Sequence, residues 1–277
     1  MTTAPTLTMN DGIAIPQLGL GVFQVPPEST AEPVRTALEQ GYRLIDTAQG
    51  YGNEEGVGKA LASAGVPREQ VFVTTKLTNS EHGRDKTLRA FDASMAKLGL
   101  DVLDLFLIHW PLPMYDQYVE TWKAFEELKD QGRIRSIGVS NFSIAHLERL
   151  GQESGTVPSV NQVELHPRFP QEELRAYHGE HGILTEAWAP IAKGKDLLAE
   201  PVVVDLAEAT GKSPAQVVLR WHVQLGNIAI PKSVTPSRIA ENIDVFDFTL
   251  DDDQMTQIAG LATGQRIGPD PEAMSNR

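Results

Sequence analysis

The regular alternation of strand-like and helix-like segments is the feature that most constrains how this chain folds. Eight short apolar runs are separated by helix-length segments in which apolar residues recur every three or four positions. No Pro-, Gly- or Ser-rich linker divides them. Eight strand–helix repeats predict a parallel sheet closed on itself, an α/β fold of the (β/α)8 TIM-barrel type formed by residues 1–277 as one domain. The predicted strands are Gln17–Val22, Arg43–Asp46, Val71–Lys76, Leu103–His109, Ile134–Val139, Ser159–Val163, Ile183–Trp188 and Asn227–Pro231.

Four segments fall outside this alternation. The run Thr6–Ile15 is predicted to form an N-terminal β-hairpin, because the Asp-Gly pair at its centre suits a type I′ turn. Long loops are predicted after the fourth strand (Pro111–Gln117) and the seventh (Ile191–Glu200), and a tail (Gly264–Arg277) ends the chain. Functional loops of such barrels gather at the carboxyl ends of the strands. We therefore expect the two loops to rim the barrel mouth and the tail to lie over it.

Composition excludes several classes of protein. The net charge of −13 argues against a nucleic-acid partner and against an anionic membrane surface. The chain has no cysteine, which excludes disulfides, thiolate metal sites and a cysteine nucleophile. The N-terminus has neither a basic nor an apolar targeting region, and no apolar stretch approaches membrane-spanning length. We expect a cytoplasmic protein, monomeric by default, whose partner is a small molecule.

Ionisable residues stand at or just beyond the ends of three successive predicted strands. Asp46 ends the second strand and Tyr51 follows five residues later, while Lys76 and His109 end the third and fourth. Taken singly, Asp46 could cap its loop, Lys76 could lie on the surface, and His109 could be a hydrogen-bonded core histidine. Because the carboxyl ends of barrel strands meet at one mouth, the four together favour a catalytic site.

This set of side chains suits the protonation of a carbonyl oxygen. A phenol such as Tyr51 is a poor acid unless a cation stabilises its anion, and Lys76 is a candidate for that cation. Asp46 would keep the lysine charged, and a neutral imidazole would orient the carbonyl. Since side chains cannot donate hydride, a nicotinamide or flavin cofactor is predicted.

The later strand ends have the composition of a cofactor site. Amide and hydroxyl groups can hold a carboxamide, and an indole can stack on a nicotinamide ring. A compact basic cluster, formed by Lys232, Ser233 and Arg238, fits a phosphomonoester such as the 2′-phosphate of NADP. The candidate residues for the ring and its carboxamide are Ser140, Asn141, Gln162 and Trp188.

Three motifs in this order resemble the signature regions of the aldo-keto reductases. They are GYRLIDTAxxxxxE at 41–54, RSIGVSNF at 135–142 and IPKSxxxxRxxEN at 230–242. The bacterial 2,5-diketo-gluconate reductase-like group is the most similar, through DTAxxYGNEEGVG, HWP at 109–111, NQVELHP at 161–167 and NIDVFDF at 242–248. The resemblance covers the whole chain and implies NADPH-dependent reduction of aldehydes and ketones, including small ketoaldehydes and keto-sugar acids. It implies that NADPH lies extended across the barrel mouth.

The resemblance also assigns roles to individual residues. It implies a catalytic tetrad of Asp46, Tyr51, Lys76 and His109, with Tyr51 as the proton donor, and substrate contacts from Phe23, Tyr51, His109 and Trp110. Departures from the family pattern are Thr78, where relatives often have tryptophan, and Arg168, where an aromatic residue is frequent. The cofactor contacts that it implies are Gly21, Val22, Phe23, Asp46, Ser140, Asn141, Gln162, Trp188, Lys232, Ser233, Arg238, Glu241 and Asn242.

The sequence lacks the patterns that other enzyme classes require. No tyrosine is followed four positions later by lysine, as a short-chain dehydrogenase needs, and Gly19 and Gly21 are followed by Gln24 where a Rossmann fingerprint has glycine. Neither HxH nor GxSxG occurs, and no metal site is predicted. His178 and His181 are predicted to be surface residues on a polar helix. Glu164 and His166 are predicted to be structural.

One alternative comes from a different class of protein. Barrels of this type also serve as binding modules, so a non-catalytic NADPH-binding regulatory subunit or redox sensor stays open. The intact set of four catalytic side chains favours the enzyme. A turnover assay separates the two hypotheses.

Overall fold

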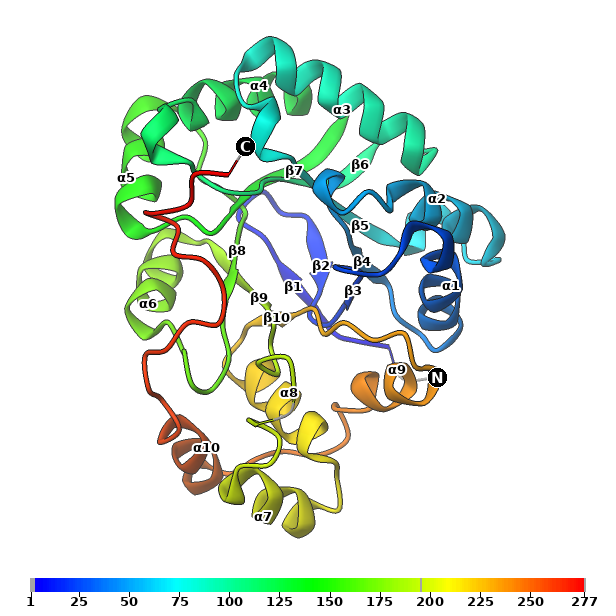
Figure 1. Cartoon of the computed structure of the whole chain (residues 1–277), viewed down its shortest axis with the longest axis vertical. Coiled ribbons are helices and arrows are strands. Elements are labelled where there is room, and N and C mark those ends of the chain that lie inside the picture. The colour runs from blue at the N-terminus through cyan, green and yellow to red at the C-terminus, as the bar shows by residue number, and fades with distance from the viewer. Residues whose placement is uncertain (1–2, 195, 277) are drawn as a thin grey trace.

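Eight parallel strands form a barrel surrounded by helices (Figure 1). The computed structural model describes residues 3–194 and 196–276, so position 195 in the second predicted loop and position 277 in the tail lie outside the described residues. The strands follow one another around the sheet, and parallel bridges Leu18–Ala229 and Gly21–Lys232 join its two edges. The predicted barrel is confirmed. Its strands are β3 (Leu20–Gly21), β4 (Leu44–Asp46), β5 (Phe72–Leu77), β6 (Leu103–Ile108), β7 (Ile134–Ser140), β8 (Val160–Glu164), β9 (Leu184–Trp188) and β10 (Ile228–Ala229).

A helix follows each barrel strand, and two helices are additional. Sequence signals mark several of their ends. Ser213 precedes Pro214, the first residue of one helix, and forms a capping box with Gln216. Gly99 adopts the left-handed backbone conformation directly after the last residue of another helix. The additional helices are α7, inserted before α8, and α10, which precedes the tail. The bounds are α1 (Ala31–Glu39), α2 (Glu54–Ser63), α3 (Arg84–Leu98), α4 (Tyr118–Asp130), α5 (Ile144–Glu153), α6 (Glu172–His181), α7 (Pro201–Thr210), α8 (Pro214–Gln224), α9 (Pro236–Ile243) and α10 (Asp252–Ala259).

The predicted N-terminal hairpin closes the amino end of the barrel. Strands β1 (Thr6–Thr8) and β2 (Ala14–Pro16) pair antiparallel. Met9 and Ile15 are buried against apolar side chains inside the barrel. The predicted type I′ turn is wrong, because only Gly12 has a positive φ, of 83°. The Met9–Ile13 hydrogen bond encloses three residues rather than two, which favours a type I turn followed by a glycine bulge.

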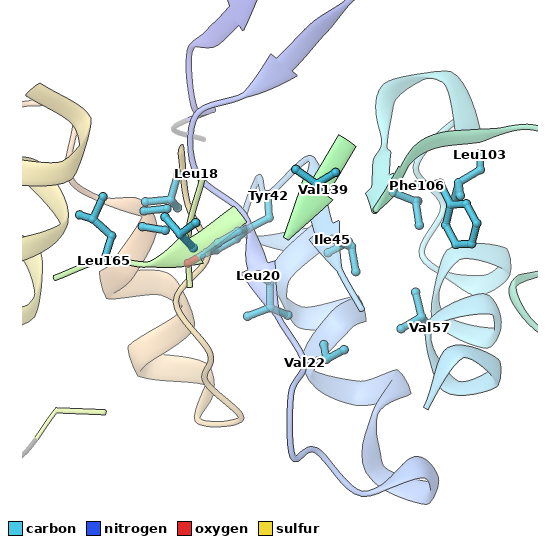
Figure 2. Close-up of a cluster of buried hydrophobic side chains, with 14 of the residues drawn as sticks. Leu18, Leu20, Val22, Tyr42, Ile45, Val57, Leu103, Phe106, Val139 and Leu165 are labelled. Carbon is cyan, nitrogen blue, oxygen red and sulfur yellow. The ribbon is translucent and has the colours of Figure 1, made fainter. Parts of the chain in front are cut away.

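Alternate residues of each barrel strand pack into two separate cores. The outer core lies between the strands and the helices, and includes Ile45 on β4, Phe106 on β6 and Val139 on β7 (Figure 2). The inner core fills the amino half of the barrel with side chains such as Leu44 and Val160. Because side chains point to opposite faces at successive positions, Asp46 shares the inward face of β4 with Leu44.

The tail crosses the carboxyl ends of the strands, as predicted. In Figure 1 it runs from α10 past α6 and α5 towards α4. Backbone N–H groups of Thr263 and Gly264 donate to Arg168 O, and Tyr115 Oη donates to Ser275 O. Tyr115 of the first predicted long loop thus contacts the tail. Glu200 of the second predicted long loop pairs with Arg168, whose carbonyl holds the start of the tail. Within residues 3–194 and 196–276, no helix has both the length and the apolar character needed to cross a membrane.

Candidate active site

A buried ion pair lies at the centre of the carboxyl half of the barrel. Lys76 Nζ donates to both carboxylate oxygens of Asp46, at 2.6 and 2.8 Å, and to Thr47 O at 2.9 Å. Lys76 is fully buried and Asp46 nearly so. Burial alone lowers the pKa of Lys76, but the charge and hydrogen bonds of Asp46, together with Tyr51 and Glu186, raise it by more. The net pKa is therefore raised and the ammonium stays charged.

Tyr51 lies between this ion pair and the mouth. It belongs to the loop after β4, and its hydroxyl is 3.4 Å from Lys76 Nζ. Its ring packs against Phe23 at 5.0 Å and against His109 at 5.7 Å between centroids. Burial raises the pKa of Tyr51, and Lys76 offsets this rise only in part. Lys76 therefore acts on the Tyr51 anion in the expected direction, while burial keeps the net pKa of the phenol above its ordinary value.

His109 directly follows β6 and provides a neutral imidazole. Burial, together with the positive charge of Lys76, lowers its pKa to about 3. Its ring makes no hydrogen bond with the residues that the structure describes, and it is half-buried beside Tyr51. The structure therefore brings the four predicted catalytic side chains together, with the phenol and the imidazole at the mouth and the ion pair beneath them.

A second cluster connects the ends of β7, β8 and β9. Trp188 Nε1 donates to Asn141 Oδ1 at 2.8 Å, and Asn141 Nδ2 donates to His109 O and to Ser140 Oγ. Asn141 has a positive φ of 63°, a conformation that asparagine tolerates better than most residues. Gln162 lies on the inward face of β8, where its Nε2 reaches Asp46 Oδ2 at 2.8 Å. The polar groups predicted to hold a carboxamide are thus connected to the predicted catalytic side chains.

The predicted basic cluster follows β10. Lys232 and Arg238 are both exposed, and neither forms an ion pair with any described residue. Arg238 lies in the first turn of α9, and Ser233 Oγ accepts from Thr235 N beside it. Two exposed cations close together in the sequence, with a hydroxyl beside them, suit an anionic ligand. Glu241 instead accepts from Ser213 Oγ through its side chain, and Asn242 is buried.

Comparison with known proteins identifies the family. Residues 17–263 match the Aldo/keto reductase family. An aldo-keto reductase of Mycolicibacterium smegmatis is 58% identical over 98% of each chain, and methylglyoxal reductase DkgA of Escherichia coli is 52% identical over 98% of each. The crystal structure of a Gox0644 mutant in complex with NADPH, 50% identical, superposes with a TM-score of 0.94 over 98% of this chain and 99% of the other.

The chain belongs to the aldo/keto reductase family. It is an oxidoreductase with the barrel of that family, and the sequence-based identification is confirmed. Of the residues assigned to the barrel loops, Gly21 ends β3, Val22 is buried, and Phe23 is 52% exposed at the mouth. Trp110 is largely buried beside His109. The roles assigned to individual side chains stay predictions.

The structure accounts for both departures from the family pattern. Arg168 Nη2 pairs with Glu200 Oε1 at 2.5 Å, while its carbonyl holds the start of the tail. The arginine therefore connects the segment after β8, the loop after β9 and the tail. Thr78 N donates a hydrogen bond to Gln49 Oε1 at 3.2 Å, and a Cβ on Gly50 would lie 3.4 Å from Thr78 Oγ1. The smaller threonine thus packs directly on the loop that carries Tyr51.

Two predictions about histidines have different outcomes. His178 is buried, not exposed: its ring contacts Asn161 Nδ2 and Thr185 Oγ1, and burial lowers its pKa to about 3. It shares a helix face with Leu174 four residues earlier, which is the signal that was missed. His181 is exposed, as predicted.

The predicted structural role of the Glu164 and His166 pair is confirmed. Glu164 accepts from His166, from Ile267 N and from Gly268 N, so it holds the tail. A Cβ on Gly268 would lie 2.3 Å from the Trp188 indole and 2.8 Å from the Glu164 carboxylate. Only glycine permits this close approach of the tail to the mouth.

Glu186 is a buried ionisable residue of the barrel interior that was not singled out from the sequence. Glu186, in the middle of β9, accepts from Gln162 Nε2 at 3.1 Å inside the barrel. Burial and the charge of Asp46 raise its pKa to about 8. The available signal was a charged residue two positions before Trp188, on the same face of an otherwise apolar strand.

Proposed function

We propose that this protein reduces the carbonyl group of small ketoaldehydes to an alcohol, with NADPH as the hydride donor. The observation that carries the proposal is the arrangement of four groups: a phenol and a neutral imidazole at the mouth, with a buried lysine–aspartate pair beneath them. A carbonyl oxygen placed between Tyr51 and His109 would meet a hydroxyl donor and an imidazole N–H.

Each of these residues has a separate task in the proposed reaction. His109, uncharged across the physiological range, orients the carbonyl oxygen by a hydrogen bond. Tyr51 donates its proton to that oxygen as negative charge develops there. Lys76 stabilises the resulting phenolate, and Asp46 keeps the ammonium charged and fixed. Bound NADPH supplies the hydride that reaches the carbonyl carbon.

The chain provides groups that fit the two ends of NADPH. Ser140, Asn141 and Gln162 offer hydroxyl and amide groups beside the indole of Trp188, which suits a nicotinamide and its carboxamide. Lys232 and Arg238 offer unpaired positive charge for a 2′-phosphate, with Ser233 between them in the sequence. NADPH is also the ligand in the crystal structure of the Gox0644 mutant.

The substrate class rests on the mouth and on one relative. Phe23 and Met114 are exposed apolar side chains, and Trp110 lies beside His109, so a small and partly apolar carbonyl compound fits. The DkgA protein of Escherichia coli is a methylglyoxal reductase. Keto-sugar acids are the second class to test. A monomeric state and a cytoplasmic location stay predictions.

The substrate proposal is tested by NADPH oxidation with the purified protein. Methylglyoxal, phenylglyoxal, an aromatic aldehyde and 2,5-diketo-gluconate form the panel, and NADH replaces NADPH as a control. We expect turnover with the ketoaldehydes. Tight NADPH binding without turnover of any compound would contradict the enzyme and support the NADPH-binding regulatory subunit or sensor.

The cofactor proposal is tested by the variant Arg238→Ala. Loss of a charge-assisted hydrogen bond to phosphate should weaken NADPH binding by about tenfold or more while leaving NADH binding nearly unchanged. The exposed Arg89 on α3 provides the control, since Arg89→Ala should change neither affinity. Equal losses for both cofactors would remove Arg238 from recognition of the 2′-phosphate.

A further inference from the structure

Glu186 is a fully buried carboxyl group that the proposed reaction does not use. It lies in the middle of β9, paired in register with Gln162 on β8 and with Ile228 on β10, and faces the barrel interior. Its Oε2 accepts one hydrogen bond, from Gln162 Nε2, while its Oε1 has no partner among the described residues. A buried carboxyl with so few partners costs stability. Its presence at this position therefore calls for a functional explanation.

Gln162 is held by two carboxyl groups at once. Its Nε2 donates to Asp46 Oδ2 at 2.8 Å and to Glu186 Oε2 at 3.1 Å, so both amide hydrogens are used. The side-chain amide is planar, and Oε1 therefore points away from both carboxyl groups. No residue in the described ranges donates to this oxygen. If the side-chain amide of Gln162 were rotated by half a turn, its oxygen instead of its nitrogen would face the two carboxyl groups, and both hydrogen bonds would be lost.

The free oxygen of Gln162 lies beside the other amide and hydroxyl groups of the site. Ser140 is the register partner of Gln162 on β7, and Asn141 N donates to Gln162 O. A nicotinamide carboxamide has an NH₂ group that needs acceptors, and an amide oxygen is one. We propose that Glu186 is a positioning residue: together with Asp46 it fixes the amide of Gln162 so that Oε1 accepts from the carboxamide NH₂ of the nicotinamide. This inference rests on the proposed function.

The charges around Glu186 are consistent with this task. Asp46 on β4 and Lys76 on β5 are the charged groups that act on it, and Gln162 on β8 is its hydrogen-bond partner. Burial and Asp46 raise the pKa of Glu186 to about 8, so the carboxyl is neutral at neutral pH and does not compete with Asp46 for Lys76. A neutral carboxyl still has an oxygen that accepts from Gln162.

Two substitutions separate positioning from space-filling. Glu186→Gln keeps a neutral acceptor of the same shape, whereas Glu186→Met keeps the length and removes the acceptor. The dissociation constants of two cofactors are measured by quenching of tryptophan fluorescence: NADP⁺ and its 3-acetylpyridine analogue, in which a methyl group replaces the carboxamide NH₂. Circular dichroism establishes that each variant is folded.

The expected result is a loss of discrimination in one variant only. The wild-type protein and Glu186→Gln should bind NADP⁺ about five- to tenfold more tightly than the analogue, and Glu186→Met should bind both with similar affinity. In a Gln162→Met background, Glu186→Met should have no further effect on NADP⁺ binding, because Glu186 acts through Gln162.

Other outcomes would overturn the inference. A Glu186→Met variant that weakens both cofactors equally would show a structural role, and one that keeps the wild-type preference would show no role. If Glu186→Met does not fold, the proposal can still be overturned by the wild-type protein. A wild-type protein that does not prefer NADP⁺ over the 3-acetylpyridine analogue would contradict it. A wild-type protein that binds neither NADP⁺ nor NADPH would contradict the proposed function itself, whereas binding without discrimination contradicts only the role of Glu186.

Discussion

The two halves of the barrel interior are built on the same strands but differ in chemistry. On β4, Leu44 belongs to the amino half, where it packs with Phe72, Val160 and residues of the N-terminal hairpin. Two positions later Asp46 belongs to the carboxyl half, where it pairs with Lys76. One half therefore contributes hydrophobic stabilisation, and the other contains charges whose burial costs free energy. The comparison indicates that the amino half supports the fold, whereas the carboxyl half holds the side chains that we propose for the reaction.

The largest expected effect comes from breaking the carboxyl half with Lys76→Met. The variant leaves Asp46 buried without its cation, so the free energy of unfolding should fall by about 3 kcal/mol. The phenolate of Tyr51 would also lose its stabilising charge, so kcat should fall by about 10³-fold. Urea denaturation and NADPH oxidation measure the two effects. Lys59→Met removes only an exposed helical ion pair with Glu55 and should leave the unfolding free energy nearly unchanged.

The matching change in the amino half is Leu44→Ala. Truncation of a fully buried leucine should lower the free energy of unfolding by about 2–5 kcal/mol. The kcat of the folded variant should stay within about threefold of the wild-type value, since the four catalytic side chains keep their contacts. A collapse of kcat with unchanged stability would contradict the division of the barrel into two functional halves.

The stability of the carboxyl half should depend on pH through Glu186. The pKa of Glu186 is about 8 in the folded protein, above the ordinary glutamate value of 4.5, so between these values the folded state holds a proton that the unfolded chain releases. Its contribution to stability is complete below about pH 4.5 and is lost as the pH rises towards 8. Glu186→Gln removes this titration. Its unfolding free energy relative to wild type should therefore rise by up to about 1.4 kcal/mol per pH unit in that window. A difference that is constant from about pH 5.5 to 7.5 would show that Glu186 keeps an ordinary pKa in the folded protein.

Much of the fold follows from patterns that act over a few residues. Strand and helix periodicity predicted all eight barrel strands, and the ionisable strand ends predicted which four side chains meet in the carboxyl half. The hairpin turn was missed because its type depends on which residues pair, here Met9 with Ile13. His178 was missed because its burial depends on how α6 packs, although Leu174 marks the same face.

Properties that depend on depth in the barrel were harder to predict. The direction of the pKa shift of Tyr51 is set by burial acting against Lys76, and sequence alone gives the neighbour but not the burial. The role of Glu186 was equally hard to predict. Its strand was predicted, but its contact with Gln162 depends on the register between β8 and β9. Local patterns therefore predict the elements, while the electrostatics of the site require the assembled barrel.

The most direct test of the central claim compares two tyrosines. Tyr51 lies in the carboxyl half, whereas Tyr42 is buried in the outer core and donates to Ile239 O at 2.9 Å. Tyr51→Phe should lower kcat for methylglyoxal by about 10²- to 10⁴-fold and leave NADPH binding nearly unchanged. Tyr42→Phe should lower the unfolding free energy by about 1 kcal/mol and keep kcat. If Tyr51→Phe retained more than about a tenth of the wild-type kcat, Tyr51 would not be the proton donor, and the assignment of the reaction to this site would be wrong.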